Sequence, residues 1–178
     1  MEISPLRTDD RLQAAELVAE AFPHPNGWPT IELALEEVDE SLAHRACLAA
    51  RDGDQLLGWV AATGLYRGRV WELHPLVVRD RARGGGIGSA LVDALARDVA
   101  ARGGLTLWVG TDDDRGETNL AHVELYPAPL DHVRRIEAPA SHPLGFYVRA
   151  GFALSGIIPD ANGSGLPAIL LARRLARQ

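Results

Sequence analysis

The stretch that decides the fold runs from Trp71 to Leu91 and reads WELHPLVVRDRARGGGIGSAL. Apolar residues over 70–78 predict a strand, and an arginine-rich turn then leads through three glycines into a helix that begins near Ile87. Free backbone N–H groups gather where a helix begins, and the helix dipole adds partial positive charge there. The order strand, turn, helix therefore predicts a cradle for a pyrophosphate at the carboxyl end of the strand.

The composition limits the class of protein and its partners. With 178 residues, the chain can bury an adequate core, and we expect one domain over 1–178. The sole cysteine, Cys47, cannot form an internal disulfide, and no apolar run approaches the roughly 20 residues of a membrane span. The first ten residues lack the features of a signal peptide. We therefore expect a cytoplasmic protein with no membrane partner.

The charge distribution predicts two ligands of opposite sign. The formal net charge is −6, which argues against general nucleic-acid binding and favours cationic partners. Arg79, Arg81 and Arg83 nevertheless cluster beside the glycines. A basic spot on an acidic protein indicates one anionic and one cationic ligand.

The hydrophobic pattern predicts an α/β protein with a mixed sheet. Strands are expected at 2–6, 47–50, 56–65, 70–78, 105–110, 152–158 and 168–174, and helices from 9 or 10 to 21, at 30–43, at 87–102 and from 142 or 143 to 150. We expect Asp9 or Asp10 to cap the first helix, whose apolar face is Leu12, Ala15, Val18 and Phe22. The polar segment 111–141 is long for a loop inside a domain, and such loops are usually functional or disordered.

The glycine loop does not match two common phosphate-binding motifs. A dinucleotide fingerprint fails because Ser89 stands at its third glycine position, and no lysine is present for a phosphate-loop NTPase. The pattern Arg/Gln-x-x-Gly-x-Gly/Ala does fit, filled by Arg83, Gly86 and Gly88. In the GNAT superfamily of acyl-CoA N-acyltransferases, which the loop resembles, this pattern cradles the coenzyme A pyrophosphate. A turn that only allows close helix packing is the alternative.

Pro75 lies in the middle of the predicted strand 70–78 and lacks the N–H that a sheet ladder needs. It therefore predicts a bulge, with a simple strand end as the alternative. A bulge would splay the strand from its neighbour and suit a pantetheine arm. It would also offer the N–H of Leu76 or Val77 to a thioester carbonyl as an oxyanion donor.

Glu72 and His74 are expected on one face of the same strand, with Trp71 and Leu73 on the other. Acylation of an amine needs a neutral nucleophile, so an ammonium substrate must first lose a proton. A carboxylate at Glu72 can accept that proton and also hold the cation. The alternatives are a solvated strand face for Glu72 and a loop-orienting role for His74.

Other candidate residues lie in the second half of the chain and in loops. Three carboxylates follow the buried strand that ends at Gly110, and we expect at least one of Asp112, Asp113 and Asp114 to bind a cation while others act as turn or cap residues. No spacing completes a metal site, so no metal is expected. Tyr147 can protonate a leaving thiolate, although packing is an equal alternative.

Three aromatic residues, Trp28, Tyr66 and Tyr126, lie in expected loops or turns rather than in apolar stripes. Such side chains can stack on sugar rings or cations, or can pack at an interface. Both interpretations stay open for each residue.

Read together, these residues resemble the aminoglycoside 6'-N-acetyltransferase branch of the GNAT superfamily over nearly the whole chain. The matching pieces are Ala21-Phe22, Trp28-Pro29, Glu36-Glu37-Val38, WELHPLVV at Trp71 to Val78, the glycine loop, Gly110-Thr111-Asp112-Asp113, Leu125-Tyr126, His142-Pro143 with Phe146-Tyr147, and Pro159-Asp160-Ala161-Asn162-Gly163. The glycine loop is specific only to the superfamily, whereas WELHPLVV, GTDD and PDANG in this order are much narrower.

The resemblance implies a single-domain GNAT fold whose mostly antiparallel central sheet splays at the acetyl-CoA site and is flanked by helices. It implies direct acetyl transfer from acetyl-CoA to the 6'-amine of an aminoglycoside, with antibiotic resistance as the consequence and a homodimer as the common assembly. The implied catalytic residues are Glu72 as base or ammonium anchor, the Leu76 backbone as oxyanion donor, and Tyr147 as acid. The implied contacts to acetyl-CoA are Leu76, Val77, Val78, Arg83, Gly84, Gly85, Gly86, Ile87, Gly88 and Ser89, and those to the acceptor are Trp28, Tyr66, Glu72, His74 and Asp112.

Three departures from the family pattern concern the substrate range and efficiency. The family's Lys-Pro-Asp-Ile is here Leu166-Pro167-Ala168-Ile169, which loses a charge pair. Gly145 stands inside an expected helix, at a cost of about 1 kcal/mol relative to alanine. Gly85 replaces a usual basic residue and removes one phosphate contact.

Two other functions stay open from the sequence. A GNAT enzyme could acetylate a polyamine, another small metabolite or a protein amine. A non-catalytic protein could bind acyl-CoA or the antibiotic without transferring an acetyl group.

Overall fold

The computed structural model describes residues 1–24 and 27–175 of the chain. These residues fall into two compact units, one holding Met1–Leu105 together with Leu175, and one holding Thr106–Arg174. The expectation of one domain over 1–178 stays a prediction.

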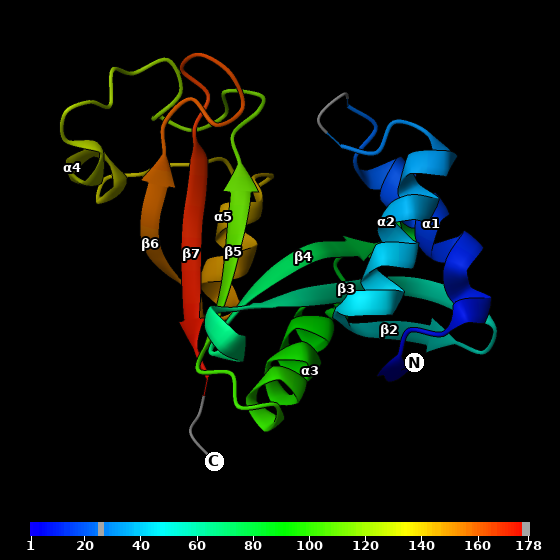
Figure 1. The fold of residues 1–178 in the computed structure, drawn as a ribbon. Helices are drawn as coiled ribbons and strands as arrows, with labels where there is room; N and C mark the ends of the chain where they lie inside the picture. The colour runs from blue at the N-terminus through cyan, green and yellow to red at the C-terminus, as the bar shows by residue number, and fades with distance from the viewer. Residues whose placement is uncertain (25–26, 176–178) are drawn as a thin grey trace. The chain divides into compact units, whose positions relative to one another are not determined.

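The first unit is built on a four-stranded antiparallel sheet (Figure 1). Its strands are neighbours in chain order: β1 (Glu2–Pro5), β2 (Ala46–Asp52), β3 (Gln55–Leu65) and β4 (Val70–Val78). Gly53, with φ of 57°, makes the tight turn between β2 and β3 that Asp52-Gly53 predicts. Short 3₁₀ turns occupy Thr8–Asp10, Tyr66–Gly68 and Asp80–Ala82.

Three helices cover this sheet. Helices α1 (Arg11–Ala21) and α2 (Ile31–His44) pack together on one face, and α3 (Ile87–Ala101) packs against β2, β3 and β4 on the other (Figure 1). In α3 the residues Leu91, Leu95 and Val99 are fully buried, as their spacing predicts. Gly103, with φ of 86°, ends α3.

The predicted buried face of α1 was partly wrong. Leu12 is 56% exposed, whereas Ala14 and Leu17 lie in the core beside Ala15 and Val18. The buried Trp59 donates from Nε1 to the Ala14 carbonyl at 3.1 Å. The alanines let the helix approach the sheet closely, so the face that packs is the one with small residues rather than the one with the first leucine.

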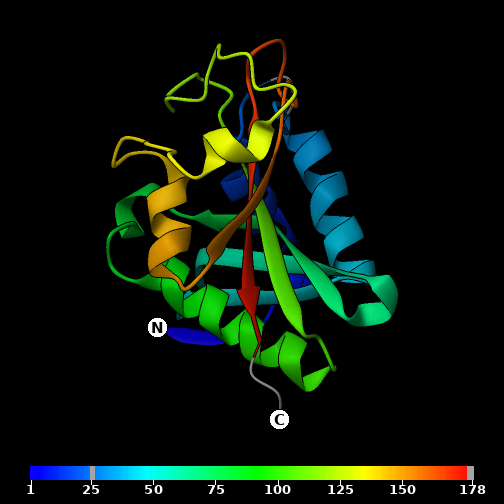
Figure 2. The same ribbon diagram turned by 90° about the vertical axis from the view of Figure 1, so that its left-hand side faces the viewer.

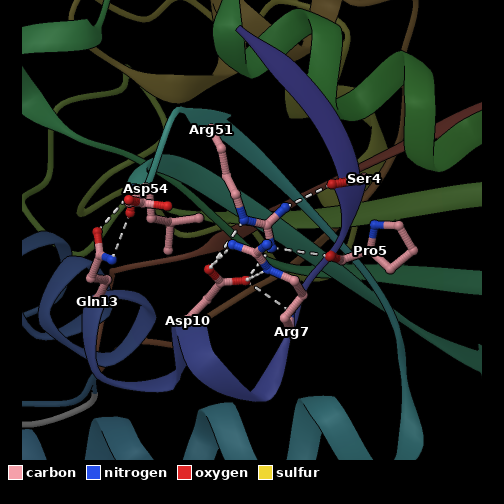
Figure 3. A network of polar contacts seen from close by, with 8 residues as sticks. Ser4, Pro5, Arg7, Asp10, Gln13, Arg51 and Asp54 are labelled. Carbon is pink, nitrogen blue, oxygen red and sulfur yellow. Dashed lines mark hydrogen bonds and ion pairs between the residues drawn. The ribbon is translucent and has the colours of Figure 1, made fainter.

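The predicted cap of α1 was also wrong, because Asp10 has another role (Figure 3). Asp10 occupies the N-cap position, but its side chain makes no cap hydrogen bond. Its buried carboxylate instead accepts hydrogen bonds from the Arg7 backbone N–H and from the buried Arg51 guanidinium. Arg51 also donates to Ser4 Oγ at 2.8 Å and to the Pro5 carbonyl at 3.1 Å, so the network ties β1 to β2.

The second unit contains a three-stranded antiparallel sheet in the order β5-β7-β6 (Figure 2). Its elements are β5 (Thr106–Asp112), α4 (Pro129–Val133), α5 (Pro143–Arg149), β6 (Ala153–Ile158) and β7 (Ala168–Arg174). Helix α4 packs against β6. Leu120, Leu125 and Val133 form a small core with Ile136 and Ile157. This core packs within the long polar segment 111–141, for which a loop was expected.

The predicted strand and helix bounds agree with those observed to within about two residues, and those of β4 and β7 agree fully. The α/β class is confirmed, and every pairing within the two units is antiparallel.

Candidate active site

Strand β4 contains the bulge predicted at Pro75. The register of β3 and β4 shifts between Val60 and Ala62. At that point β4 carries two residues, His74 and Pro75, against the single Ala61 of β3, which is the definition of a β-bulge. The strand continues past Pro75 into Leu76, Val77 and Val78, so the alternative of a strand end is wrong.

The loop after β4 presents backbone donors to solvent. Gly84 and Gly86 adopt φ of 78° and 81°, and Gly86 is the N-cap of α3. The first helical bond runs from the Ala90 N–H to the Gly86 carbonyl. Within the described chain, the N–H groups of residues 84–89 donate to no protein acceptor. Arg83, Gly84, Gly85, Gly86 and Ser89 are exposed, Gly88 is half-buried and Ile87 is buried.

This loop fits a diphosphate group. Unpaired N–H groups at the start of a 15-residue helix supply directed donors and partial positive charge. A Cβ atom built on Gly84 or Gly86 would meet nothing within 4 Å, so the positive φ, and not crowding, favours glycine there. These features agree with an anion cradle, and the role of the loop in binding stays a prediction.

The arginines beside the loop divide into structural and exposed ones. Arg79 donates from Nε to the Leu56 carbonyl at 3.2 Å and thus braces the loop against β3. Arg83 donates to the Val78 carbonyl at 3.0 Å and pairs with Asp80 at 2.9 Å, yet it stays 57% exposed. Arg81 is exposed. Arg81 and Arg83 can therefore still reach an anionic ligand.

Glu72 lies in β4 before the bulge, where it pairs with Thr63 and is half-buried. Among the described residues, its carboxylate accepts no hydrogen bond and forms no ion pair. A carboxylate without an internal partner can hold an ammonium group or accept its proton.

His74 and Trp28, both predicted to contact substrate, lie together. Their ring centroids are 5.3 Å apart and their planes are inclined by 37°. Phe22 packs edge-on against Trp28 at 5.4 Å, so the loop before α2 is anchored on the core. His74 itself is exposed. Two aromatic rings, those of Trp28 and His74, therefore lie beside the face of β4 that carries Glu72.

Tyr66 lies at the turn between β3 and β4 and is 77% exposed. Tyr66 and Arg67 have φ of 49° and 60°, a region that non-glycine residues rarely adopt. Strained backbone of this kind is common at ligand-binding loops. The structure thus places Tyr66 at an exposed turn, as predicted, but brings no other predicted site residue to it.

Sequence reasoning missed the ion pair of Glu37 and Arg45, which lies beneath the bulge. Arg45 donates from Nη1 to Glu37 Oε1, to Ser41 Oγ at 3.1 Å and to the His74 carbonyl at 3.5 Å. Both charged side chains are at least 85% buried. Glu37 was part of a matching motif, but nothing in the spacing connects Arg45 with a strand 29 residues away.

In the second unit, the motifs GTDD and PDANG meet. Asp112 at the end of β5 accepts a hydrogen bond from Asn162 Nδ2 at 3.1 Å, and Asn162 also donates to the Pro167 carbonyl. Asp112 is exposed and lies opposite Ala168 in the β5–β7 register. The departure at Ala168 therefore removes a carboxylate from the strand position that faces Asp112.

The neighbouring aspartate has a structural role. Asp113 is 1% exposed, and its carboxylate accepts from the Glu117 N–H at 2.6 Å and from the Thr118 N–H and hydroxyl. This capping role agrees with the expectation that one of the three aspartates closes a turn. It leaves Asp112 and the exposed Asp114 as the candidates for cation binding.

The same unit has an open cavity of about 380 Å³ between the chain at 122–126 and the turn at 159–165. The His122 N–H donates to the Gly165 carbonyl at 2.7 Å and holds the two segments together. The residues that line this cavity include the acidic Glu124 and Asp160 and also Tyr126, which is 59% exposed.

Tyr147 in α5 is 8% exposed and packs between the rings of Phe146 and Phe152, at 5.0 and 5.6 Å. Burial raises the pKa of its phenol, so the hydroxyl is protonated at neutral pH. Among residues 1–24 and 27–175, no group hydrogen-bonds to its hydroxyl. Tyr147 therefore packs against aromatic neighbours, which is one of its two predicted roles. Its hydroxyl also keeps the proton that the second role, protonation of a leaving thiolate, requires.

The described residues contain neither a metal-binding cluster nor a membrane-spanning helix. Across residues 1–24 and 27–175, no group of three or more His, Cys, Asp or Glu side chains could hold a metal ion. Within those ranges, every helix is too short or too polar to cross a bilayer.

Comparison with known proteins decides the family. The sequence profile of the acetyltransferase (GNAT) family matches residues 12–126. The chain belongs to the GNAT family of acetyltransferases. A search of curated protein sequences found no match.

Several solved structures are similar to this GNAT chain over its full length. An aminoglycoside 6'-N-acetyltransferase complexed with coenzyme A is 35% identical with a TM-score of 0.90, and the match covers 100% of this chain and 99% of that one. The enzyme of that name from Enterococcus faecium is also 35% identical, with a TM-score of 0.88 and the same coverage. An aminoglycoside 6'-acetyltransferase type Ii is 33% identical, with a TM-score of 0.73 and the same coverage. The resemblance predicted from the motifs is confirmed.

Proposed function

We propose that this GNAT protein transfers the acetyl group of acetyl-CoA to the 6'-amino group of aminoglycosides. The observation that carries the proposal is the 35% identity, over the full length of both chains, to an aminoglycoside 6'-N-acetyltransferase that binds coenzyme A. The unpaired donors of residues 84–89 and the unpartnered carboxylate of Glu72 support it, because they match an anionic co-substrate and a cationic acceptor.

The residues of the first unit would hold acetyl-CoA and activate its carbonyl. The N–H groups of residues 84–89, with Arg83, would bind the diphosphate, and Val77 and Val78 would lie along the pantetheine arm. When bound, acetyl-CoA supplies a thioester carbonyl that an amine can attack. The backbone N–H of Leu76, just past the bulge, would stabilise negative charge on that carbonyl oxygen.

The acceptor would be held by negative and aromatic side chains. Glu72 would bind the 6'-ammonium group and take its proton, directly or through water, so that the neutral amine can attack. Trp28 and His74 would contact the sugar ring next to it, and Tyr66 and Asp112 would add further acceptor contacts. Tyr147 would give its proton to the departing thiolate.

Direct transfer without an acyl-enzyme agrees with the state of the only cysteine. Cys47 is half-buried and donates from Sγ to the Ser41 carbonyl at 3.1 Å. Burial raises the pKa of its thiol to about 12, so it is a poor nucleophile at neutral pH. An amine that attacks the thioester itself needs no such nucleophile.

The assembly, location and physiological effect belong to the same proposal. We infer a cytoplasmic homodimer that protects its host against aminoglycosides, in line with the family resemblance. Light scattering of the purified chain tests the dimer, and the drug concentration that stops growth of an expressing strain tests the protection.

The decisive assay compares acceptors that differ at one atom. Release of free coenzyme A thiol is measured with matched aminoglycosides that carry an amine or a hydroxyl at the 6' position, with a polyamine as a third acceptor. The proposal predicts rapid release with the 6'-amine alone. Preference for the polyamine, or equal rates with amine and hydroxyl, would replace the aminoglycoside with another acceptor. Binding of coenzyme A without any transfer would indicate a binding protein.

A further inference from the structure

The bulge of β4 is contacted by Arg45, a residue that does not belong to the neighbouring strand β3. Arg45 follows directly after α2, and its main chain is extended, with φ of −119° and ψ of 164°. Its N–H donates to the Ser41 carbonyl at 3.0 Å, so the residue is fixed to the last turn of the helix. Its side chain then reaches β4 across the intervening β3, a distance of about two strand spacings, or roughly 10 Å.

The contact on β4 is the carbonyl of His74, the residue that precedes Pro75 in the bulge. The contact is long, at 3.5 Å, but its donor is a charged guanidinium, and hydrogen bonds to charged groups are stronger than neutral ones. Pro75 has no N–H, so the bulge has lost one ladder donor of its own. A partner for the His74 carbonyl therefore restrains the backbone where the ladder is weakest.

Glu37 and Ser41 hold the arginine in this position. Glu37 neutralises the guanidinium, and Ser41 Oγ lies 3.1 Å from Nη1. A partly buried ion pair gives little stability by itself, because desolvation of the two charges offsets their attraction. Since the Glu37–Arg45 ion pair adds little net stability and also contacts the bulge, we infer that its main effect is on the local geometry of β4.

We propose that Arg45 is a positioning residue: by holding the His74 carbonyl it fixes the bulge that sets Glu72 on one side and the Leu76 N–H on the other. This inference rests on the proposed function, in which Glu72 takes the proton and Leu76 stabilises the developing charge. Both groups act on the transition state, and a shift of about 1 Å in such groups lowers rates by up to about 100-fold.

The test compares two variants that both lose the ion pair. Glu37→Gln keeps the arginine and its contact with the His74 carbonyl. The double variant Arg45→Met, Glu37→Gln removes that contact as well and leaves no unpaired buried charge. We expect kcat to fall about 10- to 100-fold in the double variant relative to Glu37→Gln, with the KM for acetyl-CoA unchanged, because the loop at 84–89 is intact.

Amide hydrogen exchange supplies a readout that is independent of the acceptor. The amides of residues 72–77 should exchange at least several-fold faster in the double variant than in Glu37→Gln, while those of α3 keep the wild-type rate. Asp10→Asn is the matched control, since its ion pair contacts β1 and β2 but not β4. It should lower thermal stability without changing exchange in β4 or kcat.

The outcomes separate the two proposals. Equal kcat and equal exchange in the two Glu37 variants would overturn the role of Arg45, whatever the acceptor. An equal loss of stability and activity in the double variant and in Asp10→Asn would overturn it too, since it would show a structural effect only. If β4 exchanges faster in the double variant than in Glu37→Gln, while the wild-type protein acetylates no aminoglycoside, the positioning role is supported and the proposed acceptor is rejected.

Discussion

Two carboxylates of the first unit, Asp10 and Glu72, have opposite surroundings. Asp10 is 2% exposed, and its two oxygens accept from the backbone and side chain of Arg7 and from Arg51 (Figure 3). Glu72 is half-buried and accepts nothing from the described chain, and the N–H groups of residues 84–89 are equally without protein partners. Polar groups that the chain satisfies itself hold the fold together, whereas those it leaves unsatisfied and accessible are available to ligands.

The largest expected effect tests the unsatisfied carboxylate. Glu72→Gln removes the charge and the proton acceptor but keeps the shape, so we expect kcat to fall by about 10²- to 10⁴-fold. The midpoint of thermal unfolding should stay within about 1 °C of the wild type, because the carboxylate supports no internal contact. Steady-state thiol release and calorimetry measure the two quantities. If Glu72→Gln had the kcat of the wild type, Glu72 would have no part in the mechanism.

The satisfied carboxylate should give the reverse result. Asp10→Ala leaves the Arg51 guanidinium buried without its partner, at a cost of about 3–5 kcal/mol in the free energy of unfolding, while kcat of the folded enzyme is unchanged. Urea unfolding measures the loss. Asp39→Ala is the control, because it breaks the exposed pair with Arg11 and should cost about 1 kcal/mol or less. Similar losses in the two variants would contradict the distinction.

The pH dependence of this difference follows from the pKa of Asp10. Burial disfavours the charged carboxylate, but hydrogen bonds from Arg51 and Arg7 outweigh it and lower the pKa below its ordinary value. A lowered pKa contributes stability that is complete above the unfolded value of about 3.9 and is lost as the pH falls toward the folded value. The difference in the free energy of unfolding between the wild type and Asp10→Ala should thus be constant from pH 7 to about 5 and become smaller below about pH 4. A gap that widens on acidification would refute this sign.

Tyr147 tests whether one buried residue can both pack in the fold and take part in the reaction. Tyr147→Phe keeps the ring packing against Phe146 and Phe152 and removes only the hydroxyl. We expect about a tenfold fall in kcat, smaller than that of Glu72→Gln, with little change in stability. Stopped-flow thiol release measures it. An unchanged kcat would assign Tyr147 to packing alone.

The glycine loop offers a matched pair of smaller substitutions. Gly86→Ala places a Cβ at φ of 81°, which costs about 1–2 kcal/mol in strain, and the N–H groups should shift enough to raise the KM for acetyl-CoA several-fold. Gly85 has no positive φ, and its Cβ would meet only the Ala82 carbonyl at 3.5 Å. Gly85→Ala should therefore leave the KM unchanged, as initial rates at varied acetyl-CoA will show. Equal KM values would mean that the loop does not hold the co-substrate.

The smallest effect concerns the second unit. A Cβ at Gly145 would lie 3.2 Å from Arg149 Nη1, the mobile end of a long side chain. Gly145→Ala should raise the free energy of unfolding by about 0.5–1 kcal/mol, because alanine loses less backbone entropy in a helix. Chemical denaturation will detect it, and a loss of stability would show that α5 needs glycine for packing.

The sequence predicted well what depends on neighbours in the chain. The apolar run bounded by Gly68 and the arginines predicts β4 with its observed bounds, and the missing N–H of Pro75 predicts the bulge. The glycines predict an open, donor-rich helix start because positive φ and capping are local properties.

The sequence could not predict contacts between distant residues. Asp10 carries the usual signal of a helix cap, but its partner Arg51 lies 41 residues away in strand β2. Leu12 was expected in the core from its helical spacing with Ala15 and Val18, yet the buried face of α1 is turned toward Ala14 and Leu17. Arg45 and the His74 carbonyl meet only because β2, β3 and β4 lie side by side, which no periodicity encodes.

The central claim is that acetyl-CoA binds at the start of α3, beside Glu72. Its most direct test is a titration of the ¹⁵N-labelled protein with coenzyme A, followed through the backbone amide signals. The account predicts the largest shifts at residues 84–89, accompanied by a shift at Leu76 when the acetylated form is used. Saturable binding that leaves the signals of 84–89 unmoved would contradict it.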